Sequence, residues 1–502
     1  MEIVPWRGRL PACPSYSSFS AIEERTRRKA RAFRCAGCPV HRGSAFVAKR
    51  SSSRIKWLIL FLFILGAIWG IYGSLYLGPV PKIEISLDRP SIGATTRVTA
   101  HFAEAKRGLG SLRLEIVQGD RSLVLAEQEN PLPSPFRPWE SGDRKEVVLE
   151  GSVGRGDPEW LEEGEVTLLA SASRLGGWIR SAEGAAVEMK VEVKLRPPTL
   201  SVLSGQHYVR QGGSGVVLMK PGASAIRSGV RAGTIEFHSQ PLADSQTGAR
   251  FALFAIPWDL GDASEIVVFA EDDAGNRAER PFIDRFKAAA PRKDTIPLPE
   301  SFLQKVVPAI TSQTPTLSTR GSLLERYIRI NDGLRMENRK QIAKLSKESP
   351  PEPLWQGAFM QLPNSKQMAG FAEVRSYVYD GETVDTQTHL GLDFASVRRA
   401  KVPAVNSGRV VFADYLGIYG NAVVIDHGCG LLSVSAHLSS IAVESGTLVA
   451  KGETVGHTGA TGLAGGDHLH FGLFIRGVAT NPIEWLDPRW IEHNIASKLR
   501  AD

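Results

Sequence analysis

The stretch GGDHLHFGLF, residues 465–474, places two histidines one residue apart in an apolar segment flanked by glycines. In a β-strand, the side chains of His468 and His470 lie on one face about 6.7 Å apart, so both can reach the same pocket. A strand with two satisfied core histidines is one interpretation of this pattern, and half of a metal site is the other. The rest of the chain has to distinguish between them.

A second pair of potential ligands occurs in THLGLDFA, where His389 and Asp393 are four residues apart. In a fully extended strand their Cα atoms would be about 13 Å apart, so sharing one metal requires a bend, which Gly391 permits. A catalytic zinc site uses three protein ligands and leaves one position for water. His389, Asp393 and one histidine of the first pair can supply those three ligands.

The remaining histidine of the pair and His437, in the strand-like segment SVSAHLSS, would then lie beside the metal without binding it. Amide hydrolysis can use two such imidazoles, because one accepts the proton of the attacking water and the other stabilises the oxyanion or protonates the leaving amine. The metal lowers the pKa of the water toward about 7. Each motif alone is weak, but six of the eleven histidines lie between 389 and 470, in one Gly-rich region.

This region resembles the lysostaphin/LytM-type zinc metallopeptidases, which cut peptide bonds in peptidoglycan. The resemblance covers about a quarter of the chain and rests on blocks in the order of the family: HLGLD at 389–393, VPAVNSGRVV at 402–411, GIYGNAVVIDHG at 417–428, SAHLS at 435–439, SGTLVAKGETVGHTGATG at 445–462, GGDHLHFGL at 465–473 and TNPIEW at 480–485. It implies that Zn2+ is bound by His389, Asp393 and His470. It also implies that His437 and His468 are catalytic without binding the metal.

Other residues of the region receive weaker interpretations. Ser435 stands where the family usually has tyrosine, which puts substrate contacts in doubt but not the metal. Arg375 matches a Gly-x-Arg segment of the family and is a candidate substrate contact, whereas His427 is interpreted as structural and His457 as a surface residue. The Gly-spaced blocks also resemble biotinyl and lipoyl carrier domains, but Lys451 lacks the setting of a carrier lysine.

The N-terminal part of the chain combines a basic tail with a long apolar run. Residues 1–56 contain 13 Lys/Arg and 3 Asp/Glu, so the whole basic excess of this +7 chain lies there. The run WLILFLFILGAIWGIYGSLYL, residues 57–77, has no charged residue. As a helix it would be roughly 31 Å long, enough to cross a bilayer core, and it is longer than the apolar part of a cleaved signal peptide.

The positive-inside rule then places the tail in the cytoplasm and the later domains outside it. We therefore predict a single-pass protein of the bacterial inner membrane, anchored through residues 57–78, with periplasmic or extracytoplasmic C-terminal domains. The tail segment RTRRKARAFR could instead be a nucleic-acid arm, and Cys35, Cys38, His41 and Cys13 could bind zinc. Beside a membrane span, topogenic charge is the better interpretation of the tail, so no nucleic-acid partner is expected.

The expected fold class is mainly β, with several domains in series. Alternating apolar and polar runs predict a β-sandwich module at 79–196 and a second one at 197–288. The second ends in AEDDAGNRAERPF, whose Asp-Ala-Gly-Asn is a turn signal and resembles the last hairpin of bacterial immunoglobulin-like modules. Residues 289–350 are expected to be a connector with helices. Residues 351–490 are expected to form a Gly-rich antiparallel open barrel that carries the metallopeptidase site, followed by a tail at 491–502.

The sequence thus predicts a membrane-anchored zinc metalloendopeptidase that hydrolyses peptide stems or cross-links of peptidoglycan with a zinc-activated water and two non-ligand histidines. The alternative is a non-catalytic or latent module that binds or activates a cell-wall hydrolase, or serves envelope assembly through a protein partner of the sandwich modules. Degenerate relatives typically lose one or more of the five site residues, and all five are present here. Latency would require residues 289–388 to cover the groove, with Asn364 or Glu373 as candidates for the fourth zinc position.

Overall fold

The computed structural model describes residues 52–75, 80–131, 144–175, 183–242, 247–290 and 292–500. The basic tail before residue 52, with its cysteines and His41, therefore lies outside the described residues. Helix α1, Ser52–Leu75, contains most of the apolar run. Its segment Arg54–Ile71 has a mean hydropathy of 1.9 and is long and apolar enough to cross a membrane. None of that segment is buried in protein, unlike the core helix of a soluble domain.

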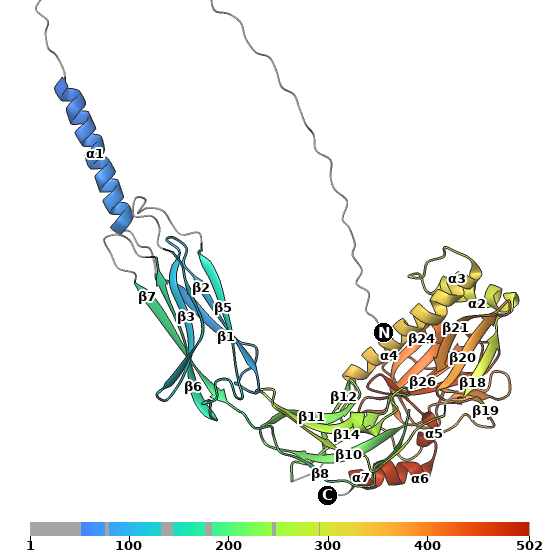
Figure 1. Cartoon of the computed structure of the whole chain (residues 1–502). Helices are drawn as coiled ribbons and strands as arrows, with labels where there is room; N and C mark the ends of the chain where they lie inside the picture. Colours follow the sequence, from blue (N-terminus) through green and yellow to red (C-terminus); the bar gives the residue numbers. More distant parts are fainter. Residues whose placement is uncertain are drawn as a thin grey trace, which may run out of the picture. The chain divides into compact units, whose positions relative to one another are not determined.

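The first β-rich module consists of a three-stranded and a four-stranded antiparallel sheet (Figure 1). The strands of the first sheet, in spatial order, are β1 (Lys82–Leu87), β2 (Thr96–Ala103) and β5 (Glu146–Val153). Those of the second sheet are β4 (Arg121–Glu129), β3 (Leu109–Gln118), β6 (Gly164–Arg174) and β7 (Gly184–Val193). Apolar side chains alternate along β2 with more exposed ones, so the two sheets enclose one core that includes Val98, Phe102 and Leu114.

The second β-rich module has two four-stranded antiparallel sheets. One contains β13 (Gln240–Pro241), β14 (Arg250–Ala255), β10 (Ser214–Pro221) and β8 (Leu200–Val202). The other contains β12 (Ile235–His238), β11 (Ala225–Ala232), β15 (Ile266–Asp272) and β16 (Arg277–Pro281). The expected turn is present, because Asp272 Oδ1 accepts from Asn276 N at 2.8 Å and Gly275 has φ +75°. The immunoglobulin-like assignment of both modules stays a prediction.

The connector forms the expected helices and one additional strand. Helix α2 spans Glu300–Gln313, α3 spans Leu323–Arg329 and α4 spans Arg335–Leu345, with a π-helical turn, Ile330–Leu334, between α3 and α4. A capping box of Ser322 and Glu325 starts α3. Strand β18 (Lys293–Pro297) pairs in parallel with β20 (Glu373–Tyr379), and β20 pairs with β21 (Glu382–His389). The connector therefore joins a sheet of the C-terminal lobe.

The C-terminal lobe is built on an eight-stranded sheet, mostly in the order β19-β22-β30-β26-β25-β24-β28, with β31 (Val478–Thr480) beside β30. The strands are β19 (Lys366–Ala369), β22 (Leu392–Ala395), β30 (Leu469–Ile475), β26 (Leu431–Leu438), β25 (Asn421–Asp426), β24 (Gly408–Tyr415) and β28 (Leu448–Val449). A smaller sheet contains β23 (Lys401–Pro403), β29 (Thr454–His457) and β27 (Ser440–Ile441).

Strand β30 is buried along its whole length because apolar material covers both faces of the sheet. Its side chains at Leu469, Phe471 and Leu473 belong to the core shared with the second module, whereas Phe474 packs in the core shared with the connector helices. Figure 1 shows α2, α3 and α4 beside the strands of this lobe. Because side chains alternate along a strand, His470 lies on the same face as Phe474, toward the connector.

Candidate metal centre

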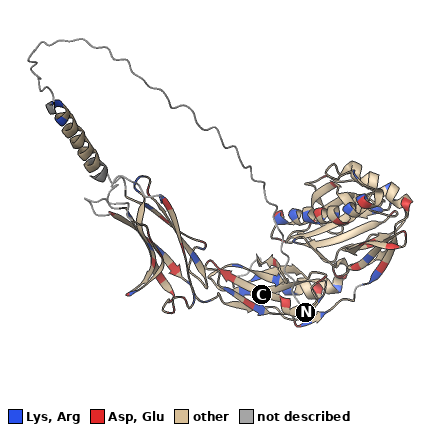
Figure 2. Cartoon of the chain, turned by 45° about the horizontal axis from the view of Figure 1, so that its top comes forward, with Lys and Arg blue, Asp and Glu red and all other residues tan. Residues whose placement is uncertain are grey.

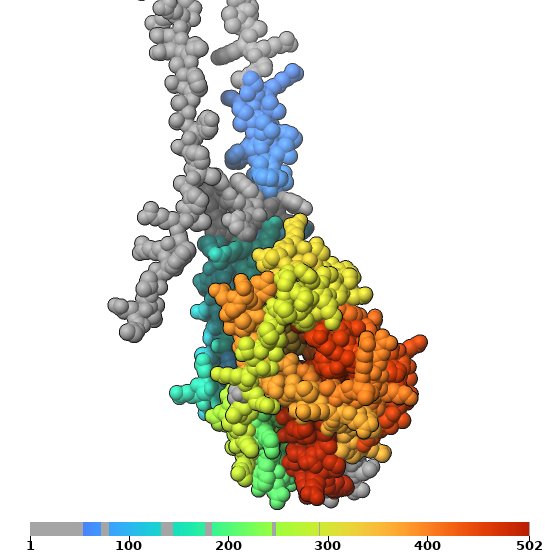
Figure 3. Space-filling model, turned by 90° about the vertical axis from the view of Figure 1, so that its right-hand side faces the viewer, coloured from blue at the N-terminus to red at the C-terminus, as the bar shows by residue number. Residues whose placement is uncertain are grey.

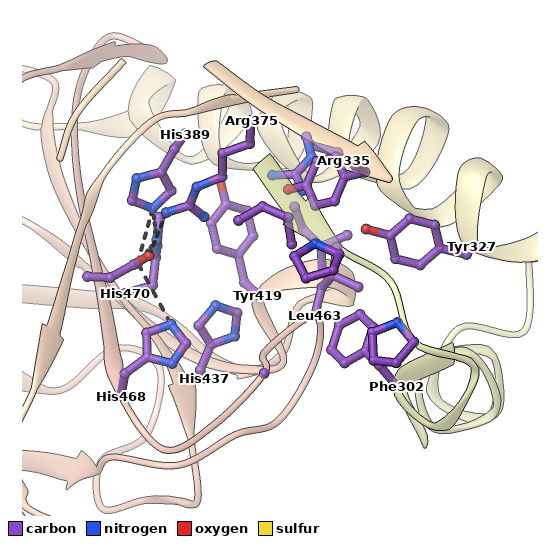
Figure 4. A pocket seen from close by; sticks show the side chains of 17 residues that line it. Phe302, Tyr327, Arg335, Arg375, His389, Tyr419, His437, Leu463, His468 and His470 are labelled. Carbon is purple, nitrogen blue, oxygen red and sulfur yellow. Dashed lines mark hydrogen bonds and ion pairs between the residues drawn. The ribbon is translucent and has the colours of Figure 1, made fainter. Parts of the chain in front are cut away.

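Three of the predicted site residues converge on adjacent strands. His389 ends β21, and Asp393 in β22 is the cross-strand partner of His470 in β30. His389 Nε2 lies 3.0 Å from Asp393 Oδ1 and 3.1 Å from His470 Nδ1, and His470 Nδ1 lies 3.0 Å from Asp393 Oδ1 (Figure 4). Each residue thus points one donor atom at a common position.

The donor set fits a zinc ion. Tetrahedral ligands about 2.0–2.1 Å from zinc are roughly 3.3 Å apart, close to the spacings of this cluster. His389 Nδ1 donates to the carbonyl oxygen of Gly370 at 2.8 Å, which leaves the lone pair of Nε2 directed at the cluster. Two imidazole nitrogens and one carboxylate oxygen are suitable zinc ligands.

Burial and charge set the protonation states that a metal requires. Burial alone would raise the pKa of Asp393, but its interactions with His389 and His470 hold the pKa well below the ordinary value. Burial lowers the pKa of His470 to about 4, although Asp393 opposes this shift. An anionic carboxylate and a neutral imidazole are the forms that bind zinc near neutral pH.

Gly391 separates the two predicted ligands of the HLGLD block, and the structure shows a packing role in addition to the expected bend. The sequence suggested that glycine permits a bend, and the chain does leave β21 after His389 and enter β22 at Leu392. However, a Cβ atom on Gly391 would lie 2.5 Å from Cε1 and 2.7 Å from Nε2 of His470. Glycine is therefore needed because the His470 ring packs directly against this backbone.

Arg375 in β20 contacts the cluster from the side. Its Nη2 donates to Asp393 Oδ2 at 2.9 Å, which leaves Oδ1 to face the two histidines. Arg375 also lines the pocket, so a substrate contact remains open to it. Its observed contact is with the carboxylate, which it orients.

The two predicted non-ligand histidines lie together beside the cluster. His437 Nδ1 donates to Thr461 O and His468 Nδ1 donates to Gly466 O, both at 2.8 Å. Their ring centroids are 4.8 Å apart, and His468 Nε2 lies 3.7 Å from Asp393 Oδ1. Burial, with help from the neighbouring histidines, lowers the pKa of His437 well below its ordinary value. In both rings Nε2 is the nitrogen that remains able to exchange a proton.

All five side chains line one cavity of about 500 Å³. Figure 3 shows a hollow at this end of the molecule, bordered by yellow atoms of the connector and by orange and red atoms of the strands. Six connector residues also line the cavity: Ile296, Pro297, Pro299, Phe302, Tyr327 and Arg335. The latency alternative had residues 289–388 covering the groove, but no pattern in the sequence identified these six residues as part of the cavity wall.

The remaining candidate residues of the sequence analysis do not line the cavity. His427 is buried and bonds Ser407 O and Ser433 Oγ, and His457 bonds Ser440 Oγ. Ser435 is buried in β26 away from the cavity. Neither candidate for a fourth zinc ligand lines the cavity: Glu373 accepts from Gly370 N, and Asn364 accepts from Ser396 through its backbone.

Comparison with known proteins places this site in a known family segment. A family model described as Peptidase family M23 matches residues 387–482. The DD-carboxypeptidase/endopeptidase Mpg of Neisseria meningitidis serogroup B is 39% identical over 95 residues, which are 19% of this chain and 22% of that protein. Peptidoglycan DD-endopeptidase ShyA of Vibrio cholerae is 38% identical over 96 residues, 19% of this chain and 22% of ShyA.

A third relative is named as an activator of hydrolases rather than as an endopeptidase. The murein hydrolase activator EnvC of Escherichia coli is 34% identical over 96 residues, which are 19% of this chain and 23% of EnvC. The chain thus matches about a fifth of the length of each of these relatives.

Proposed function

We propose that this chain, whose C-terminal domain is a peptidase family M23 domain, is a membrane-anchored zinc metalloendopeptidase that hydrolyses peptide bonds in peptidoglycan. The observation that carries the proposal is the convergence of three donor atoms and two further imidazoles on one cavity. The similarity to proteins named as endopeptidases supports the reaction, and the name of ShyA supports the substrate. The apolar helix α1 supports the anchor.

The residues of the cavity divide the work of amide hydrolysis. His389, Asp393 and His470 would hold the zinc ion, which when bound would polarise the scissile carbonyl and activate a water for attack. His437 and His468 keep Nε2 free because their Nδ1 atoms are bonded to backbone carbonyls. One of them accepts the proton of the water, and the other donates to the oxyanion or the leaving amine. Arg375 keeps Asp393 in position through Oδ2.

The same proposal assigns the remaining segments. The basic tail lies in the cytoplasm of a bacterium, α1 crosses the inner membrane, and residues 79–502 lie outside the cytoplasm. The two β-rich modules are then the segments available to an envelope protein partner.

A peptidoglycan digestion tests the proposal against the activator alternative. Full-length protein in detergent is loaded with zinc and incubated with purified peptidoglycan, and new amino termini are identified by mass spectrometry. We expect release that stops with a chelator and is lost in His468→Ala. Equal, chelator-insensitive release by both proteins would exclude the enzyme. If the protein alone released no peptides but stimulated a cell-wall amidase, the result would favour an activator, the role given in the name of EnvC.

A further inference from the structure

The end of the cavity away from the metal cluster contains an unpartnered hydroxyl. Tyr327 of α3 is fully buried, and its ring packs edge-on against Phe302 and Tyr377. Within the described part of the chain, its hydroxyl has no hydrogen-bond partner. Figure 4 shows that hydroxyl pointing from α3 into the cavity, opposite the cluster. Burial raises the pKa of Tyr327 far above its ordinary value, so its hydroxyl stays protonated. This hydroxyl can therefore donate a hydrogen bond to a ligand in the cavity.

Arg335 of α4 lies at the same end and is held in a fixed orientation. Its Nε donates to Asn331 O at 2.9 Å, and its Nη2 donates to Asn331 Oδ1. Asn331 is itself buried and donates to Asp385 Oδ2 at 2.7 Å. Asn331 is part of the π-helical turn between α3 and α4, so this turn fixes the position of the guanidinium.

The charges that line the cavity do not balance at this end. Only Arg335, Arg375 and Asp393 among the described lining residues carry a full charge, and Arg375 is paired with Asp393. Arg335 forms no ion pair among the described residues: the carboxylate of Asp385 is connected to it only through Asn331, and Asp385 does not line the cavity. A partly buried arginine without a carboxylate partner is a site for an anion.

A second arginine adds to the positive potential. Arg339 lies one helical turn after Arg335 and donates to Thr388 O at 3.4 Å. Burial lowers its pKa, and the charge of Arg335 contributes to the shift. Figure 2 shows further basic residues along the connector helices. Arg339 does not line the cavity, so its charge adds to the positive potential at this end without touching an anion there.

We propose that Tyr327 and Arg335 form a carboxylate-binding subsite, so that the preferred substrate is a peptide carrying a carboxylate at a set distance from the bond that is cut. Arginine binds carboxylates through charge-assisted, often bidentate hydrogen bonds, and a tyrosine hydroxyl can donate a third. The identity of the substrate as a peptide rests on the function proposed above. Both residues precede the segment matched by the family model, so this preference is specific to chains that share the connector.

A peptide stem offers two sources of the carboxylate, namely its free C-terminus and an internal or side-chain carboxyl group. The probes are therefore a cross-linked stem dimer with all carboxylates free, the same dimer amidated at the C-terminus, and the same dimer amidated at the internal group. Binding is measured by calorimetry with full-length, zinc-loaded His468→Ala protein, which does not consume the probe. We expect one amidated probe to bind at least about tenfold more weakly than the free dimer, and that probe identifies the source.

Three variants in that background test the residues themselves. Arg335→Gln should weaken binding of the free dimer about tenfold to a hundredfold, the range of hydrogen bonds between charged groups. It should leave the affinity for the identified amidated probe unchanged. Tyr327→Phe, which removes only an unpartnered oxygen and should not destabilise the fold, should weaken binding a few-fold. Lys340→Gln is the matched control, since it removes an exposed charge of the same helix that does not line the cavity.

The outcomes separate this proposal from the proposed function. Equal binding of all three probes, absence of binding, or equal effects of Arg335→Gln and Lys340→Gln would overturn the subsite even if the wild-type protein cuts peptidoglycan. Arg335-dependent binding in a protein that never cuts would support the subsite and reject the enzyme. For an active enzyme with this subsite, Arg335→Gln should raise KM and leave kcat within about twofold.

Discussion

Glu484, in the block TNPIEW, makes a pH-dependent contact between the C-terminal lobe and the second β-rich module. Helix α5, Pro482–Trp485, places its buried carboxylate against β10, where Oε2 accepts from Ser214 N at 3.0 Å. The neighbouring Trp485 Nε1 donates to Ser214 Oγ at 3.0 Å. Burial raises the pKa of Glu484 to about 7, although the bond from Ser214 and the charge of Arg210 oppose the shift.

The sign and size of the effect follow from that shift. The folded protein holds the proton up to a pKa of about 7, whereas the unfolded chain releases it at about 4.5. Stability from this group is therefore greatest at low pH and falls as the pH rises from about 4.5 to about 7. One pKa unit corresponds to about 1.4 kcal/mol. The free energy of unfolding should therefore fall by about 2–3 kcal/mol between pH 5 and pH 8 on account of Glu484.

Glu484→Gln isolates this contribution, because glutamine keeps an acceptor for Ser214 N and cannot ionise. Its melting temperature should match that of the wild-type protein near pH 5 and exceed it at pH 8. Glu444→Gln is the control, since Glu444 is exposed, and its difference from wild type should not change with pH. A difference between Glu484→Gln and wild type that stays constant from pH 5 to pH 8, or favours wild type as the pH rises, would refute the reasoning.

Three further predictions concern the metal centre. His470→Ala should lose bound zinc, whereas His468→Ala should keep it and lose about 10²–10⁴-fold in activity; equal zinc loss in both, by elemental analysis, would contradict these roles. Gly391→Ala should lose zinc because its Cβ would press on the His470 ring, while Gly466→Ala, with open space around it, should retain zinc; equal zinc content would remove the packing argument. Arg375→Gln should weaken zinc binding about 10–100-fold in a chelator competition, and unchanged affinity would show that the carboxylate needs no support.

Local patterns in the sequence identified the candidate donors, whereas the choice of His470 over His468 as the third donor came from the family resemblance. His470 in β30 and His468 just before this strand both line the cavity, as a period of two predicts, and the HLGLD block supplies two donors within five residues. The mainly β class was also predictable, since alternation and turn residues are local signals. The need for glycine at position 391 could not be predicted, because its Cβ would collide with the ring of His470, a residue 79 positions later.

The connector illustrates the limit of such patterns. Strand β18, KDTIP, has no strict alternation, and its parallel pairing with β20 depends on residues about 80 positions away. The apolar positions of the segment predict a helical stripe that includes Ile330 but not Tyr327, and both residues are buried. A periodicity cannot show that Tyr327 carries its hydroxyl to a cavity wall, because that depends on how the helix is docked.

The connector helices and the matched segment 387–482 contribute different parts of the cavity, which bears on substrate specificity. The five residues proposed for zinc and proton transfer all lie within the matched segment 387–482, whereas Tyr327 and Arg335 come from helices outside it. The helices are nevertheless fixed relative to the strands, because Leu303, Val307 and Ile330 share a core with Ile418 and Phe474. Packed cores resist displacement by even a methylene group, so the connector can position a recognition group as firmly as the strands position the donors. Substrate preference can therefore change through the connector while the chemistry remains the same.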